Sequence, residues 1–97
     1  MWSDCVTIYR ETICDMERIV ADGCHFEEKV EGRADITGTR QVLSGLLLAP
    51  AQVSLRAGDR VCRGVGPEKP DGGCARISRV RPFFLDGRLH HWEAEAV

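Results

Sequence analysis

The sequence predicts an all-β protein, a small antiparallel β-barrel or sandwich of six to seven short strands with long loops. Ten glycines and four prolines in 97 residues indicate more turns than a helical bundle needs. Several segments alternate apolar with polar residues and are rich in β-branched and aromatic side chains, as strands are. The length is typical of one domain, and we expect residues 1–97 to form a single barrel without repeats or linkers.

The first third of the chain predicts three short strands. Residues 5–10 alternate, with Val6, Ile8 and Arg10 on one side, and residues 12–16 either extend this strand or form a turn. A second strand is expected over residues 18–21. Asp22-Gly23 follows it and favours a tight hairpin turn, so residues 24–31 should form the return strand.

The middle of the chain predicts a loop and then a buried strand. The polar stretch Gly32, Arg33, Ala34, Asp35, Ile36, Thr37, Gly38 is expected to be a long, mobile loop. Residues 39–48 are apolar enough for a buried strand, with a short helix as the alternative. Gly45 disfavours the helix, and Pro50 sets the end of the segment.

The last third predicts three further elements. Gly58-Asp59 indicates a tight turn before a strand over residues 60–63, and Gly66–Gly73 is a second turn-rich loop. Residues 74–81 are strand-like and should end at Pro82. A turn at Asp86-Gly87 then leads to a closing strand over residues 90–97.

The charge distribution and the start of the chain indicate which classes of function to expect. The net charge of −2 argues against a general nucleic-acid binder. Residues 1–48 carry five basic and nine acidic side chains and residues 49–97 eight and six, an asymmetry that suits head-to-tail association. The start of the chain does not resemble a signal peptide, and the longest apolar run, 46–49, is far shorter than a membrane helix. We therefore expect a protein made in a cytoplasm, with its five widely spaced cysteines as thiols.

The sequence contains no recognisable catalytic or metal-binding motif. It has no nucleophile-elbow, zinc-protease or phosphate-loop pattern, and Gly64-Val65-Gly66 is followed by a proline that lacks an amide hydrogen. Cys24-His25 and His90-His91, joined by Cys62 and Cys74, could in principle hold zinc, but neighbours on a strand point to opposite faces. We therefore expect no enzyme, no catalytic or metal-ligating residue and no cofactor.

Basic residues gather near aromatic ones in the last third of the chain. Arg76, Arg79, Arg81 and Arg88 are close in sequence to Phe83, Phe84 and Trp92. Such a mixture on a small OB-like or SH3-like barrel can bind single-stranded nucleic acid, which is the alternative function. Regular alternation would place Arg79 and Arg81 on one face and Arg76 on the other.

The order of these segments resembles a family of small tailed-phage and prophage proteins, the minor capsid or head-completion proteins. The resemblance lies in residues 1–10, in 18–26, in the apolar segment ending near Pro50, in 58–64 and in the Ile-x-x-Val of 77–80. It spans nearly the whole chain and depends on order and spacing more than on any one motif.

The resemblance implies a structural virion protein of the head-to-tail connector, made in the host cytoplasm. Such proteins form a ring of copies between the portal and its adaptor on one side and tail-completion or tail proteins on the other. In the stopper type, a loop from each copy projects into the channel and helps retain packaged DNA. Gly32–Gly38 is then the candidate channel loop and Gly66–Gly73 the second choice. Candidate residues of the subunit interface are Arg76, Arg79, Arg81 and Arg88, and no membrane partner is expected.

Overall fold

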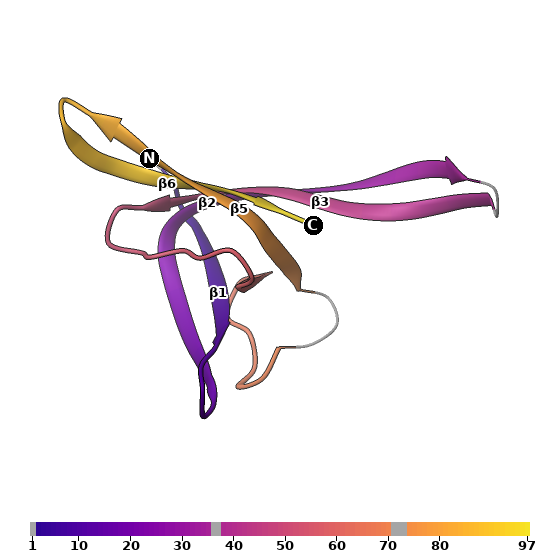
Figure 1. The fold of residues 1–97 in the computed structure, drawn as a ribbon, viewed down its shortest axis with the longest axis horizontal. Helices are drawn as coiled ribbons and strands as arrows, with labels where there is room; N and C mark the ends of the chain where they lie inside the picture. Colours follow the sequence, from indigo (N-terminus) through magenta and orange to yellow (C-terminus); the bar gives the residue numbers. More distant parts are fainter. Residues whose placement is uncertain (1, 36–37, 71–73) are drawn as a thin grey trace.

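The computed structural model describes residues 2–35, 38–70 and 74–97, and this part of the chain forms a closed antiparallel β-barrel (Figure 1). Around the barrel the strands follow the order β1–β2–β3–β6–β5–β4, and β4 pairs back onto β1. The all-β prediction is thus confirmed. The strands are β1 Asp4–Glu11, β2 Met16–Asp35, β3 Gly38–Pro50, β4 Arg60–Arg63, β5 Ala75–Leu85 and β6 Arg88–Ala96.

The two longest strands form a hairpin that extends well beyond the barrel, to the right in Figure 1. β2 and β3 pair from His25 opposite Leu48 out to Asp35 opposite Gly38. The next strand, β6, pairs with β3 only from Gly45 to Pro50. In the described structure, the outer part of the hairpin is therefore a two-stranded ribbon, which we call the long arm (residues 29–35 and 38–44).

The prediction of a loop over residues 32–38 was wrong for most of that stretch. Gly32–Asp35 belong to β2 and Gly38 begins β3, whereas Ile36 and Thr37 lie outside the described residues. The polar sequence was mistaken for a loop because an arm outside the barrel needs no apolar alternation to form a ladder. The strand predicted over residues 39–48 is confirmed as part of β3, and the helix alternative is wrong.

Asp22-Gly23 is a bulge inside β2 and not the predicted hairpin turn. The β1–β2 register shifts here, because Asp4 lies opposite Cys24 but Val6 lies opposite Ala21. Gly23 has φ +72°, which glycine adopts without the cost that a Cβ would impose. The extra residue bends β2, so that one strand serves both the barrel and the long arm.

β5 continues through Pro82, which was expected to end it. Pro82 lies opposite Trp92 of β6, whereas β4 reaches only Ala75 and Arg76 of β5. The proline therefore sits on a strand edge without a second neighbour, where a missing amide hydrogen is tolerated. The predicted turn at Asp86-Gly87 is confirmed, and both residues have positive φ, 52° and 76°, as a two-residue hairpin turn requires.

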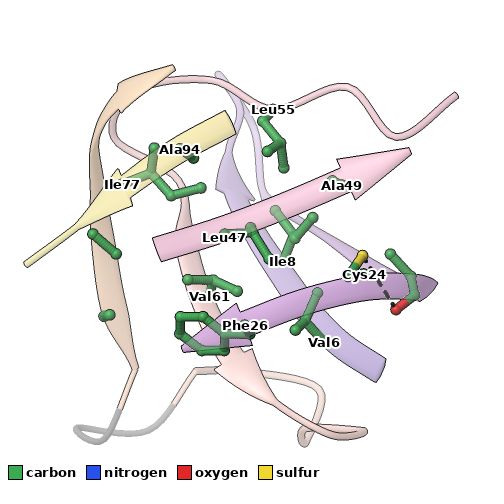
Figure 2. Packing of buried hydrophobic residues seen from close by; sticks show 13 residues of the cluster. Val6, Ile8, Cys24, Phe26, Leu47, Ala49, Leu55, Val61, Ile77 and Ala94 are labelled. Carbon is green, nitrogen blue, oxygen red and sulfur yellow. Dashed lines mark hydrogen bonds between the residues drawn. The ribbon is translucent and has the colours of Figure 1, made fainter. Parts of the chain in front are cut away.

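Side chains from all six strands fill the barrel (Figure 2). Val6, Ile8 and Leu47 have no exposed surface, and the small side chains of Ala94 and Ala96 on β6 are buried as well. The connection from β3 to β4 adds Leu55 to the core. None of the described residues forms a helix long and apolar enough to cross a membrane. Residues buried in the core include Val6, Ile8, Phe26, Leu47, Val61 and Ile77.

Candidate assembly surfaces

A second, shorter arm projects from the other end of the same sheet (Figure 1). It is the β5–β6 hairpin, which we call the short arm (residues 78–95). Its tip carries three consecutive apolar residues, Phe83, Phe84 and Leu85, with 44%, 60% and 53% of their surface exposed. Consecutive exposed apolar side chains are unusual on a free surface and are typical of a contact site. Sequence analysis named Phe83 and Phe84 only as aromatic neighbours of arginines and did not predict a projecting apolar tip.

The predicted interface arginines all lie on the outside of the barrel. A register shift between Ile77 and Arg79 inserts one extra residue into β5, so the alternation changes phase at Ser78. Ala75, Ile77 and Val80 face inward, and Arg76, Arg79 and Arg81 are all exposed. The prediction that Arg76 opposes the other two was therefore wrong. Arg88, just after the turn, is exposed as well.

Glutamates stand opposite two of these arginines. Arg79 is registered with Glu95 and Arg81 with Glu93 on the adjacent strand β6. Directly opposed residues of an antiparallel pair share a face, so opposite charges there attract each other. Positive and negative side chains therefore alternate on the outer face of the short arm, and this face is not a uniformly basic groove.

An aromatic cluster lies beside the tip of the short arm. The ring of Phe83 stacks on that of His91 with centroids 4.6 Å apart, and Trp2 meets His91 edge-on at 5.0 Å. His91 is 8% exposed, and its Nε2 lies 3.2 Å from a carboxylate oxygen of Glu93. The cluster fastens the N-terminal residues to β6, a connection that the sequence did not reveal.

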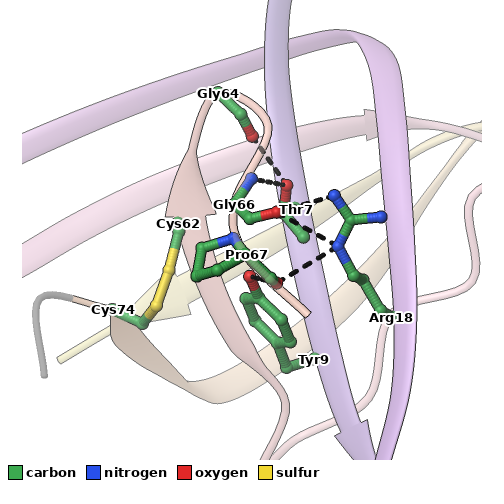
Figure 3. Close-up of a disulfide and its surroundings, with 8 residues drawn as sticks. All are labelled: Thr7, Tyr9, Arg18, Cys62, Gly64, Gly66, Pro67 and Cys74. Atoms are coloured by element: carbon green, nitrogen blue, oxygen red, sulfur yellow. Dashed lines mark hydrogen bonds between the residues drawn. A yellow bond between two sulfur atoms is a disulfide. The ribbon is translucent and has the colours of Figure 1, made fainter. Parts of the chain in front are cut away.

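The beginning of the second candidate for a channel loop is held against the barrel (Figure 3). The Thr7 hydroxyl donates to the Gly64 carbonyl at 2.7 Å and accepts from the Gly66 amide at 2.8 Å. The Tyr9 hydroxyl donates to the Pro67 carbonyl, and Arg18 donates to the Gly66 carbonyl at 2.6 Å. Residues 64–67 thus cover β1 and do not project, whereas residues 71–73 lie outside the described part.

Cys62 and Cys74 form a disulfide beside this loop, with Cα atoms 4.7 Å apart (Figure 3). The expectation that all five cysteines are thiols was wrong for this pair. The bond closes the segment between β4 and β5, which contains the anchored residues 64–67. Cys5, Cys14 and Cys24 are free thiols, and Cys14 is exposed in the turn after β1.

Burial governs the chemistry of Cys24. Its side chain has no exposed surface, and desolvation, followed by the neighbouring Cys5, Asp22 and Asp4, raises the pKa of the thiol to about 11. Burial and a hydrogen bond with Asp22 also raise the pKa of Cys5. Both thiols therefore stay protonated and unreactive near neutral pH, as structural cysteines do.

The considered zinc ligands do not gather around one point. Among the described residues, no three or more His, Cys, Asp or Glu side chains are placed to hold a metal ion. Cys62 and Cys74 are engaged in their disulfide, Cys24 is in the core, and His90 and His91 contact each other through their Nδ1 atoms at 2.8 Å.

Comparisons with protein-family models, with curated proteins and with solved structures find no match to this chain.

Proposed function

We propose that this protein is a structural subunit of the head-to-tail connector of a tailed phage, of the stopper or head-completion type. Copies would form a ring that joins the portal and its adaptor to tail-completion or tail proteins in the virion. The ring would help to retain packaged DNA. The proposal gives the chain an assembly role and no catalytic one.

The long arm is the observation that carries the proposal. The resembled family combines a small β-barrel with a long insertion that projects from it, and here β2 and β3 extend beyond a closed, filled barrel (Figure 1). A subunit that only enclosed a ligand would need interior space, but this barrel is packed with side chains. A subunit that must reach neighbours and a channel needs rigid extensions, and a hydrogen-bonded ribbon is a stiffer extension than a loop.

The tip of the long arm remains the candidate channel element. This tip includes Gly32–Asp35 and Gly38, which lie at the end of the ribbon farthest from the barrel. DNA must pass the channel during packaging and ejection, so its lining should lack a dense row of basic side chains. The stretch 32–38 contains one arginine and one aspartate, which fits this requirement.

The first test is the identity of the genes that flank this one. We expect portal or capsid genes on one side and tail genes on the other, and mass spectrometry of purified phage particles should detect the protein. Neighbouring genes of metabolism or nucleic-acid processing, or particles that lack the protein, would overturn the connector function. A deletion of the gene should yield heads that lose their DNA and do not join tails, and complementation with the intact gene is the control.

Binding of single-stranded nucleic acid is the second candidate, favoured by the exposed Phe83 and Phe84 next to Arg79 and Arg81. The glutamates opposite both arginines weaken it, because they also repel phosphates. Oligonucleotide binding that falls steeply with salt, and that is lost on Arg79→Ala/Arg81→Ala, would support this function. Absence of binding at low salt would exclude it.

A further inference from the structure

The outer edge of β5 is a strand edge without a partner in the described structure. β4 pairs with β5 only at Ala75 and Arg76, and the next residue, Ile77, is bonded to the Gly58 amide and the Asp59 carbonyl at 2.7 Å each. From Ser78 to Leu85, all ladder partners of β5 in the described part of the chain belong to β6. The backbone groups on the other side are therefore open to pairing with another strand.

β2 has a matching open edge along the long arm. Near the barrel this side of β2 is bonded: the Phe26 amide donates to the Asp4 carboxylate at 3.0 Å, and Arg63 donates to the Phe26 carbonyl at 2.6 Å and to the Glu28 carboxylate at 3.3 Å. From Glu27 to Asp35, all ladder partners of β2 among the described residues belong to β3. At about 3.3 Å per residue, this edge is roughly 30 Å long and the open edge of β5 roughly 26 Å, so the two are similar in length.

We infer that the β2 edge of the long arm pairs with the β5 edge of a second copy of this chain. A two-stranded ribbon alone is marginally stable in water, and three or more strands are needed for independent stability. A neighbour's β5 would supply the third strand, so that sheets of adjacent copies become continuous. The inference deepens the proposed function and rests on it for the closure of the copies into a ring.

Charge selects β2 over β3 as the strand that meets β5. The eleven residues of β5 include three arginines and no acidic residue. Residues 27–35 of β2 contain four acidic and two basic residues, whereas residues 38–44 of β3 contain one arginine and no acidic residue. Opposite net charges on β5 and β2 favour this pairing and disfavour pairing of β5 with β3 or with another β5.

The placement of the arms fits repeated head-to-tail contact. The long arm and the short arm project from opposite ends of one sheet, so a molecule can give its β2 edge to one neighbour and its β5 edge to another (Figure 1). Contacts between two different surfaces generate rings when the rotation closes. The exposed Phe83, Phe84 and Leu85 lie along the same β5 edge and would lose water in the contact.

A charge-swap experiment tests the inference. Arg79→Glu/Arg81→Glu makes β5 acidic, and Glu31→Lys/Asp35→Lys makes β2 basic. Each variant alone should assemble at least about tenfold more weakly than the wild type, because like charges then face each other at every contact. An equimolar mixture should regain assembly, because each variant then meets an oppositely charged edge on the other. Size-exclusion chromatography with light scattering measures the change.

The control carries Arg60→Glu/Lys69→Glu, the same change in net charge as the β5 variant at two exposed residues elsewhere, and should assemble like the wild type. Hydrogen–deuterium exchange of the wild type provides a readout without substitutions, since residues 27–35 and 78–85 should both gain protection on assembly. Circular dichroism checks that each variant is folded.

Three outcomes would overturn the interface: a wild type that stays monomeric at millimolar concentration, assembly without protection of residues 78–85, or folded variants that do not assemble when mixed. None of them bears on whether the protein occurs in virions, which decides the connector function. Conversely, assembly through these edges by a protein absent from phage particles would refute the connector and leave the interface standing.

Discussion

Arg10 and Asp59 form an ion pair that fastens the β3–β4 connection to β1. Arg10 donates to both Asp59 carboxylate oxygens, at 3.0 Å and 2.7 Å, and to the Ser54 carbonyl at 2.9 Å. The Arg56 amide also donates to Asp59, at 3.0 Å. The hydrogen bond from Arg10 to Asp59 raises the pKa of the guanidinium, because it stabilises the charged form of Arg10.

Asp59→Ala should therefore destabilise the fold by about 3 kcal/mol, because it leaves the mostly buried Arg10 charge and a turn amide without their acceptor. Urea unfolding followed by circular dichroism measures the change. Arg60→Ala is the matched control, since Arg60 is exposed next to Asp59 and should cost less than about 0.5 kcal/mol. Equal midpoints for Asp59→Ala and the wild type would show that the pair does not hold this connection.

The buried thiol of Cys24 predicts a loss of stability in alkali. Its pKa is about 11 in the folded protein and 9.0 ordinarily, so between these values the unfolded chain has lost a proton that the folded one keeps. The contribution of this thiol to the free energy of unfolding is fully present below pH 9 and decreases as the pH rises towards 11. Cys24→Ala should reduce the slope of unfolding free energy against pH in that window, and Cys14→Ala, at an exposed thiol, should not. Identical slopes in all three proteins would refute the assignment.

At the scale of elements, the disulfide stabilises the segment that connects β4 to β5. Cys62 and Cys74 are 12 residues apart, and a loop of this size predicts a stabilisation of about 3 kcal/mol through the unfolded chain. A reducing agent should lower the urea midpoint of the wild type by a corresponding amount. Cys62→Ser/Cys74→Ser should show the lowered midpoint with or without reductant. A wild type that ignores the reductant would mean that the bond does not form in solution.

The elements that the sequence predicted correctly are those with local signals. The strand at β1, the turn before β4 and the Asp86-Gly87 hairpin each depend on neighbouring residues, and each is present. The same local sequence signal can also be compatible with two different structures. Asp22-Gly23 supports a hairpin turn or a bulge equally well, because both use a glycine with positive φ.

The features that were missed depend on partners far away in the chain. Pro82 is tolerated because β4 stops at Arg76, and Cys62 meets Cys74 because β4 lies beside β5. The long arm lies outside the barrel, so it lacks the apolar alternation that identifies a strand. For the candidate site, the sequence was enough to identify the four arginines. Their common outward face could not be predicted, because it depends on the bulge at Ser78.

At the scale of the whole molecule, the fold divides into a barrel that supplies stability and two arms that offer contact surface. The core cluster is built from side chains of the barrel, from Val6 on β1 to Ala96 on β6. The arms extend the sheet to both sides and contribute to a longest dimension of 48 Å against a shortest of 25 Å (Figure 1). A chain built only to be a stable monomer would have no need of this elongation. The division implies that assembly can be removed without removing the fold.

Replacement of residues 29–44 by Asn-Gly tests that division. The new turn joins Glu28 to Gly45, which already face each other, and Asn-Gly suits a two-residue hairpin. The barrel should keep its free energy of unfolding to within about 1 kcal/mol, because the core residues on both sides of the replaced segment, such as Phe26 and Leu47, are retained. The shortened protein should nevertheless remain monomeric where the wild type assembles, because the β2 edge is gone.

The control replaces residues 12–15 with Asn-Gly, which shortens the hairpin between β1 and β2 at the turn between Glu11 and Met16. This variant should assemble normally, because both inferred edges are intact. Assembly of the arm-less protein would show that copies meet through another surface, and loss of its barrel would show that the arm is part of the folding unit. A folded, monomeric, arm-less protein that still enters phage particles would locate the arm's role between copies and assign docking on the portal or tail to the barrel itself.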